Sequence, residues 1–386
     1  MSGEPSPIDL PLREDLRGNV PYGAPQIDVP VRLNTNENPH PVPVHVADAV
    51  AAAVAAQVRG LNRYPDREFT ELRGALAAYA SRVTGVAQDA DRLWAGNGSN
   101  EVLQHLFLAF GGPGRTALGF VPSYSMHGEI AGVTATSWAR GSRGPWDGPD
   151  PFGLTADDAV AQVRRYAPDM VFLCSPNNPT GTALDLRVVR AVLAAAPRAV
   201  VVVDEAYGEF ARPGTPSAAT LLADHPLLVV TRTMSKAFAF AGARVGYLLA
   251  DARVTAALRL VRLPYHLSSL TQAAAVAALR HADDMLATVA ATVAQRDRIT
   301  AAAGRRGLRP VPSDANFVLI GGFADATAAW RALLDRGVLV RDVGLPGHLR
   351  ASAGTPAETD AFLAALEDLV TTDPATIDAT PQAVTA

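Results

Sequence analysis

The sequence predicts an α/β fold, with a large domain built on a mainly parallel central sheet covered by helices and a smaller α+β domain after it. Short apolar runs, β-branched in part and bounded by turns, recur between residues 92 and 250 and are typical of strands buried on both faces. Amphipathic stretches separate several of these runs, which favours parallel strands joined by helices. The pattern changes after about residue 268, which predicts the smaller domain.

The large domain, residues 46–267, follows an N-terminal arm. Residues 1–45 are rich in Pro and Gly, and we expect them to run extended and to contribute to the small domain. Helices are expected at 46–58, 68–83, 100–110, 156–166 and 186–196. Strands are expected at 92–95, 116–121, 133–138, 170–174, 199–203, 227–231 and 245–250. Ligands of such sheets bind beyond the carboxyl ends of the strands, so residues at these ends are the first candidates for a site.

The small domain, residues 268–370, opens with an Ala-rich helix at 268–303, which we expect to be bent or broken. The elements expected after it are a strand at 315–320, a helix at 324–336, strands at 338–340 and 349–353, and a helix at 356–370. Residues 371–386 contain Pro, Thr and Ala without periodicity, which predicts a disordered tail.

Composition excludes several classes of function. The net charge is −4 with scattered Lys and Arg, so neither a nucleic-acid partner nor a membrane surface is expected. The N-terminus lacks a basic region followed by an apolar stretch, so no signal peptide is expected. A single cysteine, Cys174, allows no disulfide within the chain, which fits a cytoplasmic protein. The eight histidines show no His-x-x-x-His or Cys/His clustering, so no metal site is expected.

A lysine lies in an apolar, Gly- and Ala-rich segment after the run at 227–231. Ser235 precedes Lys236 directly, and Arg244 follows eight residues later. A desolvated lysine loses its proton more easily, so Lys236 could form a Schiff base with an aldehyde cofactor. Ser235 and Arg244 would hold an anion close by, and Arg suits phosphate because its planar fork donates two hydrogen bonds. An aldehyde with a phosphate tail is pyridoxal 5'-phosphate, although the segment alone also fits a surface Lys and Arg beside a loop.

Turns after three other strands carry polar or aromatic groups. Gly98, Ser99 and Asn100 open a helix, where free N–H groups and the helix dipole make an anion site. Two prolines and a glycine fix the turn that holds Asn178, whose amide could reach a ring oxygen. Tyr124 could stack on a pyridine face. Taken singly, these segments also fit a tight connection, a proline turn and a core tyrosine.

Asp204 ends an apolar strand, and a carboxylate there needs a partner. A pyridine nitrogen is a plausible partner, because the ion pair keeps that nitrogen protonated and the ring electron-withdrawing. Tyr207 lies three residues on and can reach the phenolic oxygen of the same ring. Asp204 and Glu205 could instead bind metal or act as a Walker-B-like pair, but no Gly-x-x-x-x-Gly-Lys motif accompanies them.

In this order along one chain, the segments resemble fold-type I pyridoxal phosphate-dependent aminotransferases, and within them most closely the histidinol-phosphate aminotransferases. The resemblance spans about residues 10 to 370. The segments that carry it are Leu33-Asn-Thr-Asn-Glu-Asn-Pro39, Arg63-Tyr-Pro-Asp66, Gly96-Asn-Gly-Ser-Asn-Glu101, Pro122-Ser-Tyr-Ser-Met126, Pro176-Asn-Asn-Pro-Thr-Gly181, Asp204-Glu-Ala-Tyr-Gly-Glu-Phe210, the Lys236 segment, Val261-Arg-Leu-Pro-Tyr265, Ser313-Asp-Ala-Asn-Phe317 and Leu349-Arg-Ala-Ser-Ala-Gly354.

The resemblance implies a role for each candidate around the cofactor. Lys236 would be the Schiff-base lysine, and Asp204 would pair with the ring nitrogen. The remaining cofactor contacts implied are Asn178 and Tyr207 at the ring oxygen, Tyr124 on the ring face, and Ser235, Arg244 and the turn Gly98–Asn100 at the phosphate. His127 stands where relatives often carry Tyr, a change expected to affect packing alone.

Further implied roles concern the substrate and a second subunit. Tyr64 would reach the cofactor phosphate of the neighbouring subunit, so a homodimer is expected. Arg350 would bind the substrate carboxylate, helped by Arg341, and Tyr22 would close over the substrate. The same cationic pocket would accept the phosphate of histidinol phosphate.

The implied reaction moves an amino group between L-histidinol phosphate and 2-oxoglutarate, with imidazole acetol phosphate and L-glutamate as their counterparts, in histidine biosynthesis. Lys236 would carry the proton between the substrate and the cofactor. Two alternatives stay open on the same scaffold: an aromatic amino acid aminotransferase or a phosphorylated amino acid decarboxylase. A non-catalytic regulatory module would need a lost lysine or an attached DNA-binding domain, and the sequence has neither.

Overall fold

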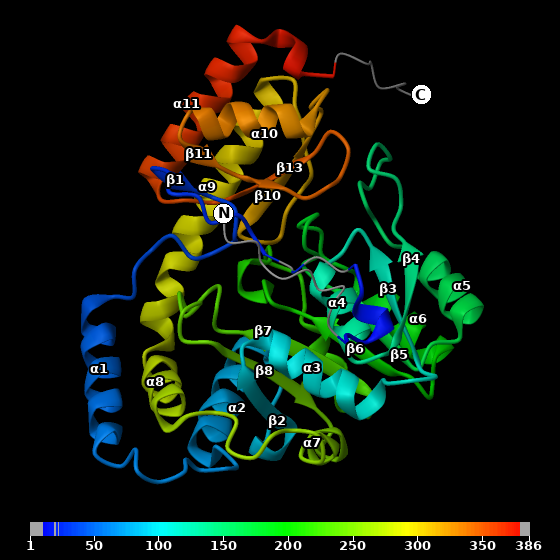
Figure 1. Cartoon of the computed structure of the whole chain (residues 1–386), viewed down its shortest axis with the longest axis vertical. Helices are drawn as coiled ribbons and strands as arrows, with labels where there is room; N and C mark the ends of the chain where they lie inside the picture. The colour runs from blue at the N-terminus through cyan, green and yellow to red at the C-terminus, as the bar shows by residue number, and fades with distance from the viewer. Residues whose placement is uncertain (1–10, 19–20, 22, 379–386) are drawn as a thin grey trace.

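The structure, a computed structural model, describes residues 11–18, 21 and 23–378 as a larger and a smaller body (Figure 1). The larger body contains a seven-stranded sheet in the order β2-β8-β7-β6-β5-β3-β4. Neighbouring strands are parallel from β4 to β7, whereas β8 is antiparallel to β7 and β2. The predicted α/β fold with a mainly parallel sheet is confirmed. The strands are β2 (Leu93–Asn97), β3 (Thr116–Val121), β4 (Ser137–Ser142), β5 (Met170–Cys174), β6 (Val200–Asp204), β7 (Leu228–Thr233) and β8 (Val245–Ala250).

The central strands are almost wholly apolar because both of their faces are buried. Every residue of β5, β6, β7 and β8 is buried. In β6 four valines precede Asp204, so a carboxylate stands at the carboxyl end of a strand that is otherwise hydrocarbon. The rigid core therefore presents its few polar groups at one edge of the sheet.

α-Helices connect the successive strands from β2 to β6, and side chains cap several of these helices. Thr155 accepts the N–H of Asp158 at the start of α5, and Asp185 accepts the N–H of Arg187 at the start of α6. Along the described part of the chain, no helix is long and apolar enough to cross a membrane. The helices of this region are α1 (Val44–Val58), α2 (Thr70–Thr84), α3 (Ser99–Phe110), α4 (Ser125–Val133), α5 (Ala156–Tyr166), α6 (Leu186–Ala195) and α7 (Ala252–Leu258).

The strand expected at 133–138 is wrong for most of its length. Val133 ends α4, a turn with Ala135 at φ 56° follows, and pairing with β3 begins at Ser137. β4 is an edge strand whose residues are mostly exposed or half-buried, so it lacks the apolar run that marks the central strands. The apolar residues read as a strand belong to the preceding helix and turn.

The smaller body carries a four-stranded antiparallel sheet in the order β12-β13-β10-β9. Strand β1 from the N-terminal arm pairs in parallel with β11, so the arm joins this body. A capping box of Thr355 and Glu358 starts α11. The elements are β1 (Val31–Arg32), β9 (Arg309–Pro310), β10 (Phe317–Gly321), α10 (Ala326–Asp335), β11 (Val338–Leu339), β12 (Arg341–Asp342), β13 (Leu349–Ser352) and α11 (Pro356–Thr372).

The long Ala-rich helix is broken, as expected, at His281 between α8 (Ser269–Arg280) and α9 (Ala282–Arg305). Residues of α8 pack in the large core with the central sheet, whereas Ile299 and Ala303 of α9 pack in the core of the smaller body. Figure 1 shows α9 running from one body into the other. The packing therefore shifts the division expected at residue 268 to a point within α9.

The disordered tail expected from residue 371 is wrong for its first part. α11 continues to Thr372, a 3-10 helix spans Pro374–Thr376, and Ile377 bridges to Phe323. This segment is ordered because Ile377 packs against the core of the smaller body. Residues 379–386 lie outside the described residues.

Candidate active site

A cavity of about 450 Å³ lies at the carboxyl ends of the central strands, between the two bodies. Its wall combines the ends of β5, β6 and β7 with the first residues of α3, the arm segment 34–37 and residues of β12 and β13. The predicted site residues that line it are Ser99, Asn100, Tyr124, Asn178, Asp204, Tyr207, Ser235, Lys236, Arg244, Arg341 and Arg350. The topology thus brings together residues that are scattered along the chain.

Lys236 enters the cavity from the turn after β7. Its Nζ donates a hydrogen bond of 3.0 Å to the carbonyl oxygen of Thr35. Burial, followed by the positive charge of Arg350, lowers the pKa of Lys236 to about 8. The neutral amine, which is the reactive form of a lysine nucleophile, is then far more populated near neutral pH than in an ordinary lysine.

Asp204 is 2% exposed and has a partner at each carboxylate oxygen. Thr231 donates its hydroxyl to Oδ1 at 3.0 Å, and Nε2 of His127 lies 3.0 Å from Oδ2. His127 is itself buried in the first turns of α4. The expectation that His127 affects packing alone is therefore wrong, because its ring contacts the acidic group that the site is built around.

Tyr207 follows β6 and is held by the arm. Asn36 donates from Nδ2 to the Tyr207 hydroxyl at 3.0 Å, and Ser352 donates its hydroxyl to Asn36 Oδ1 at 3.0 Å. Burial raises the pKa of Tyr207 to about 12. The phenol therefore stays protonated and can donate a hydrogen bond to a ligand.

Arg350 of β13 reaches across from the smaller body. Its Nη1 donates to Oδ1 of Asn178 at 2.5 Å, and its Nη2 donates to the carbonyl oxygen of Asn34 at 2.8 Å. Its guanidinium also lies over the ring of Phe317, 5.2 Å from the centroid. A buried cation is thus oriented at the cavity wall beside the amide of Asn178.

Hydrogen-bond donors gather where α3, β8 and the Lys236 turn converge. Gly98 is the N-cap residue of α3, and a Cβ there would lie 2.3 Å from Nη2 of Arg244. A Cβ on Gly246 would lie 2.1 Å from the main-chain nitrogen of Ser99, so only glycine fits. Arg244 Nη1 lies 3.5 Å from the hydroxyl of Ser235. The guanidinium of Arg244, the hydroxyl of Ser235 and the N-terminus of α3 therefore meet in one place.

Two further predicted residues lie at the cavity wall. Tyr124 donates its hydroxyl to Oδ1 of Asn100 at 3.1 Å, and its ring meets the ring of His127 edge-on at 5.4 Å. Arg341 of β12 is half-buried, and its Nη1 and Nη2 each lie 3.5 Å from the carbonyl oxygen of Gly23. Arg341 therefore adds a second positive charge near Arg350.

The structure does not bring Tyr64 to the cavity of its own chain. Its side chain is 81% exposed and stacks on Tyr265 with ring centroids 4.5 Å apart. Tyr22, the predicted lid residue, lies outside the described residues.

The resemblance includes the arm segment 33–39, but no role at the cavity wall was predicted for its residues. Asn34, Thr35, Asn36 and Glu37 all line it, and three of them contact predicted site residues. The available signal was the polar run Asn34-Thr-Asn-Glu-Asn38 inside an otherwise Pro-rich segment. For His127, the signal was its place three residues after Tyr124, one turn along the same helix.

Comparison with known proteins agrees with this geometry. Residues 28–366 match the family described as aminotransferase class I and II. The chain belongs to that family. This aminotransferase is 58% identical over 366 residues to the histidinol-phosphate aminotransferase of Mycolicibacterium smegmatis, covering 95% of each chain. It is 57% identical over 363 residues to the histidinol-phosphate aminotransferase of Paenarthrobacter aurescens, covering 94% of this chain and 95% of that one.

A solved structure resembles the fold of this aminotransferase closely. The histidinol-phosphate aminotransferase of Sinorhizobium meliloti in complex with pyridoxal-5'-phosphate superposes with a TM-score of 0.77 at 27% identity. The match covers 89% of this chain and 92% of that one. The likeness in fold therefore extends over most of both chains.

Proposed function

We propose that this aminotransferase transfers an amino group between L-histidinol phosphate and 2-oxoglutarate, yielding imidazole acetol phosphate and L-glutamate. The observation that carries the proposal is the 58% identity along 95% of the chain to an enzyme of that name. Two arginines at one wall of the cavity, Arg350 and Arg341, agree with substrates that all carry a negatively charged group. Such an enzyme serves histidine biosynthesis, and we expect it in the cytoplasm.

The cavity fits pyridoxal 5'-phosphate as the cofactor. Ser99, Asn100, Ser235 and Arg244, with Gly98 beside them, form a donor set suited to a phosphate. Asp204 is a buried carboxylate that suits a protonated ring nitrogen, and Lys236 is an amine with a lowered pKa. When bound, this cofactor takes up the amino group and withdraws electrons from the substrate carbon.

We assign Lys236 two tasks. Its neutral amine is the covalent attachment point for the cofactor aldehyde. The same amine, when free, would accept the proton from the substrate carbon and hold it for return to the product. The lowered pKa suits both tasks, because it allows the amine to bind and release a proton near neutral pH.

The pyridine ring of the cofactor would be oriented by Asp204, Asn178 and Tyr207. The hydroxyl of Thr231 and the ring of His127 hold the Asp204 carboxylate in one position, so its charge faces a fixed point of the cavity. Tyr207 stays protonated and, with the Asn178 amide, can donate to a ring oxygen. Tyr124 provides an aromatic face for the ring.

Arg350, helped by Arg341, would bind the carboxylate of glutamate and the phosphate of histidinol phosphate in turn. The planar fork of Arg350 is already oriented by Asn178 and Asn34, so little freedom is lost when an anion binds. Tyr22 would close over the substrate from the arm.

We further propose a homodimer in which Tyr64 contributes to the site of the partner subunit. Exposed apolar side chains cluster in sequence around its stacking partner Tyr265, namely Leu260 and Leu263. Large exposed apolar side chains next to each other favour a subunit interface. Sedimentation analysis should give twice the chain mass of 40.4 kDa, and a monomer would contradict the proposal.

The substrate is tested by comparing amine donors with 2-oxoglutarate as the acceptor. We expect kcat/KM for histidinol phosphate to exceed that for phenylalanine. Faster turnover of phenylalanine would identify an aromatic amino acid aminotransferase instead, and release of carbon dioxide from a phosphorylated amino acid would identify a decarboxylase.

A further inference from the structure

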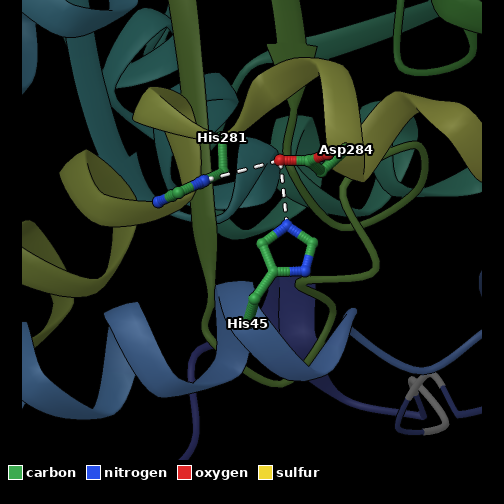
Figure 2. Close-up of side chains that lie close together, drawn as sticks. All are labelled: His45, His281 and Asp284. Atoms are coloured by element: carbon green, nitrogen blue, oxygen red, sulfur yellow. Dashed lines mark ion pairs between the residues drawn. The ribbon is translucent and has the colours of Figure 1, made fainter.

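Two histidines and an aspartate from separate parts of the chain meet at the start of α9 (Figure 2). His45 lies in the first turn of α1, His281 lies between α8 and α9, and Asp284 lies in the first turn of α9. His45 Nε2 is 3.0 Å from Asp284 Oδ2, and His281 Nδ1 is 3.5 Å from the same oxygen. Figure 2 shows a nitrogen of each ring directed at the carboxylate.

The three ligand atoms, one from each residue, all lie within 4.8 Å of one another. Zn²⁺ in proteins is bound by nitrogen and oxygen atoms at about 2.0–2.2 Å, so tetrahedral ligand atoms lie about 3.3–3.5 Å apart. The distances from Asp284 Oδ2 to His45 Nε2 and to His281 Nδ1 are already close to this spacing. The three side chains are partly exposed, so a small rotation can bring the rings together without disturbing the core.

The charged side chains next to the cluster are paired with one another. Asp283, next to Asp284, forms an ion pair with Arg82, and Arg280 forms one with Glu71 at 2.8 Å. These neighbouring charges are therefore paired with each other, whereas Asp284 faces the two imidazoles.

We propose that His45, His281 and Asp284 form a binding site for a divalent transition metal such as Zn²⁺. Two imidazoles and a carboxylate are a ligand set typical of first-row metals of this kind. Water would complete the coordination, because His45 and Asp284 are exposed to solvent.

A metal at this site fastens α1 to α9. The arm segment that lines the cavity leads directly into α1, and Asn38 already connects it to α9 through a 3.1 Å hydrogen bond to the Thr288 hydroxyl. Asn38 also donates to the carbonyl oxygen of Ala237, next to Lys236. Metal binding therefore secures the stretch of chain that supplies Thr35 and Asn36 to the cavity.

Calorimetric titration of the holoenzyme, free of any histidine tag and treated with a chelator, with ZnCl₂ tests the site. We expect one Zn²⁺ per chain in the native protein and in the control variant His225→Gln, which changes a histidine outside the cluster. Affinity should fall by at least about tenfold in His45→Gln, His281→Gln and Asp284→Asn, because each loses a ligand. Zn²⁺ should raise the Tm of the native protein and of the control, but not of these three variants.

Stoichiometric binding with the same affinity in all variants would overturn the proposal, as would the absence of stoichiometric binding by the native protein. The latter would mean that the three side chains only contact one another and bind no metal. A readout that needs no variant is the visible absorption of the native protein with Co²⁺. Intense bands of a four-coordinate ion are expected, and the weak spectrum of the hydrated ion would contradict a built site.

Discussion

Asp204→Asn tests the electrostatic centre of the site, because it removes one charge and keeps the shape of the side chain. Asp204 is 2% exposed, and both of its oxygens are engaged at 3.0 Å, by Thr231 and by His127. An amide cannot keep a bound pyridine nitrogen protonated, so the electron withdrawal on which the reaction depends is weakened.

We expect Asp204→Asn to change both the catalytic rate and the stability of the folded state. A hydrogen bond to a charged group contributes about 1.5–3 kcal/mol, which corresponds to about a 10- to 150-fold change in rate. Transfer from the amino donor and transfer to the keto acceptor both need the protonated pyridine ring of the cofactor. We therefore expect kcat to fall by about 100-fold or more. The folded state should lose only about 1 kcal/mol, because Asn accepts one of the two hydrogen bonds and the His127 ring can accept from the new amide.

The assay is steady-state turnover with histidinol phosphate and 2-oxoglutarate, together with thermal unfolding and the bound-cofactor absorbance of the same preparations. Thr231→Val is the matched control, because it removes one hydrogen bond to Asp204 and keeps the charge. Its kcat should stay within about tenfold of the native value. An Asp204→Asn variant that binds the cofactor fully and turns over within about threefold of the native rate would refute the reasoning.

Lys236→Ala should abolish turnover. Borohydride reduction should attach the cofactor covalently to the native chain but not to the variant. Turnover of the variant near the native rate would exclude a catalytic role for Lys236. In the apoenzyme, the rate of cofactor attachment should rise with pH through about 8, because the neutral amine reacts and burial lowers the pKa of Lys236 to that value. A midpoint near the ordinary lysine value of 10.5 would show that the cavity does not act on this amine. Arg350→Lys should raise KM for glutamate and for histidinol phosphate by about 10- to 100-fold, with a smaller change in kcat. The reason is that an ammonium cannot contact Asn178, Asn34 and an anion together. An unchanged KM for both substrates would contradict anion binding at Arg350.

The central strands and their polar ends were predictable from the sequence. β5, β8 and α5 occupy the residues expected of them, because buried apolar runs and a strong amphipathic pattern are local signals. The sequence predicted the edge strand β4 at the wrong residues, because its exposed side chains do not form a buried apolar run. Residue roles around Lys236 and Asp204 could be inferred from neighbours a few positions away, and these residues do line one cavity.

By itself, the sequence determined the α/β fold, the family resemblance and most of the side chains of the candidate site, because each depends on short segments. Only the tertiary structure decided which distant groups touch. Thr35 meets Lys236, His127 meets Asp204, Arg350 meets Asn178, and His45 meets Asp284 only after the arm, the central sheet and the smaller body have packed together. The lowered pKa of Lys236 arises in the same way, because its burial and the closeness of Arg350 exist only in the folded chain.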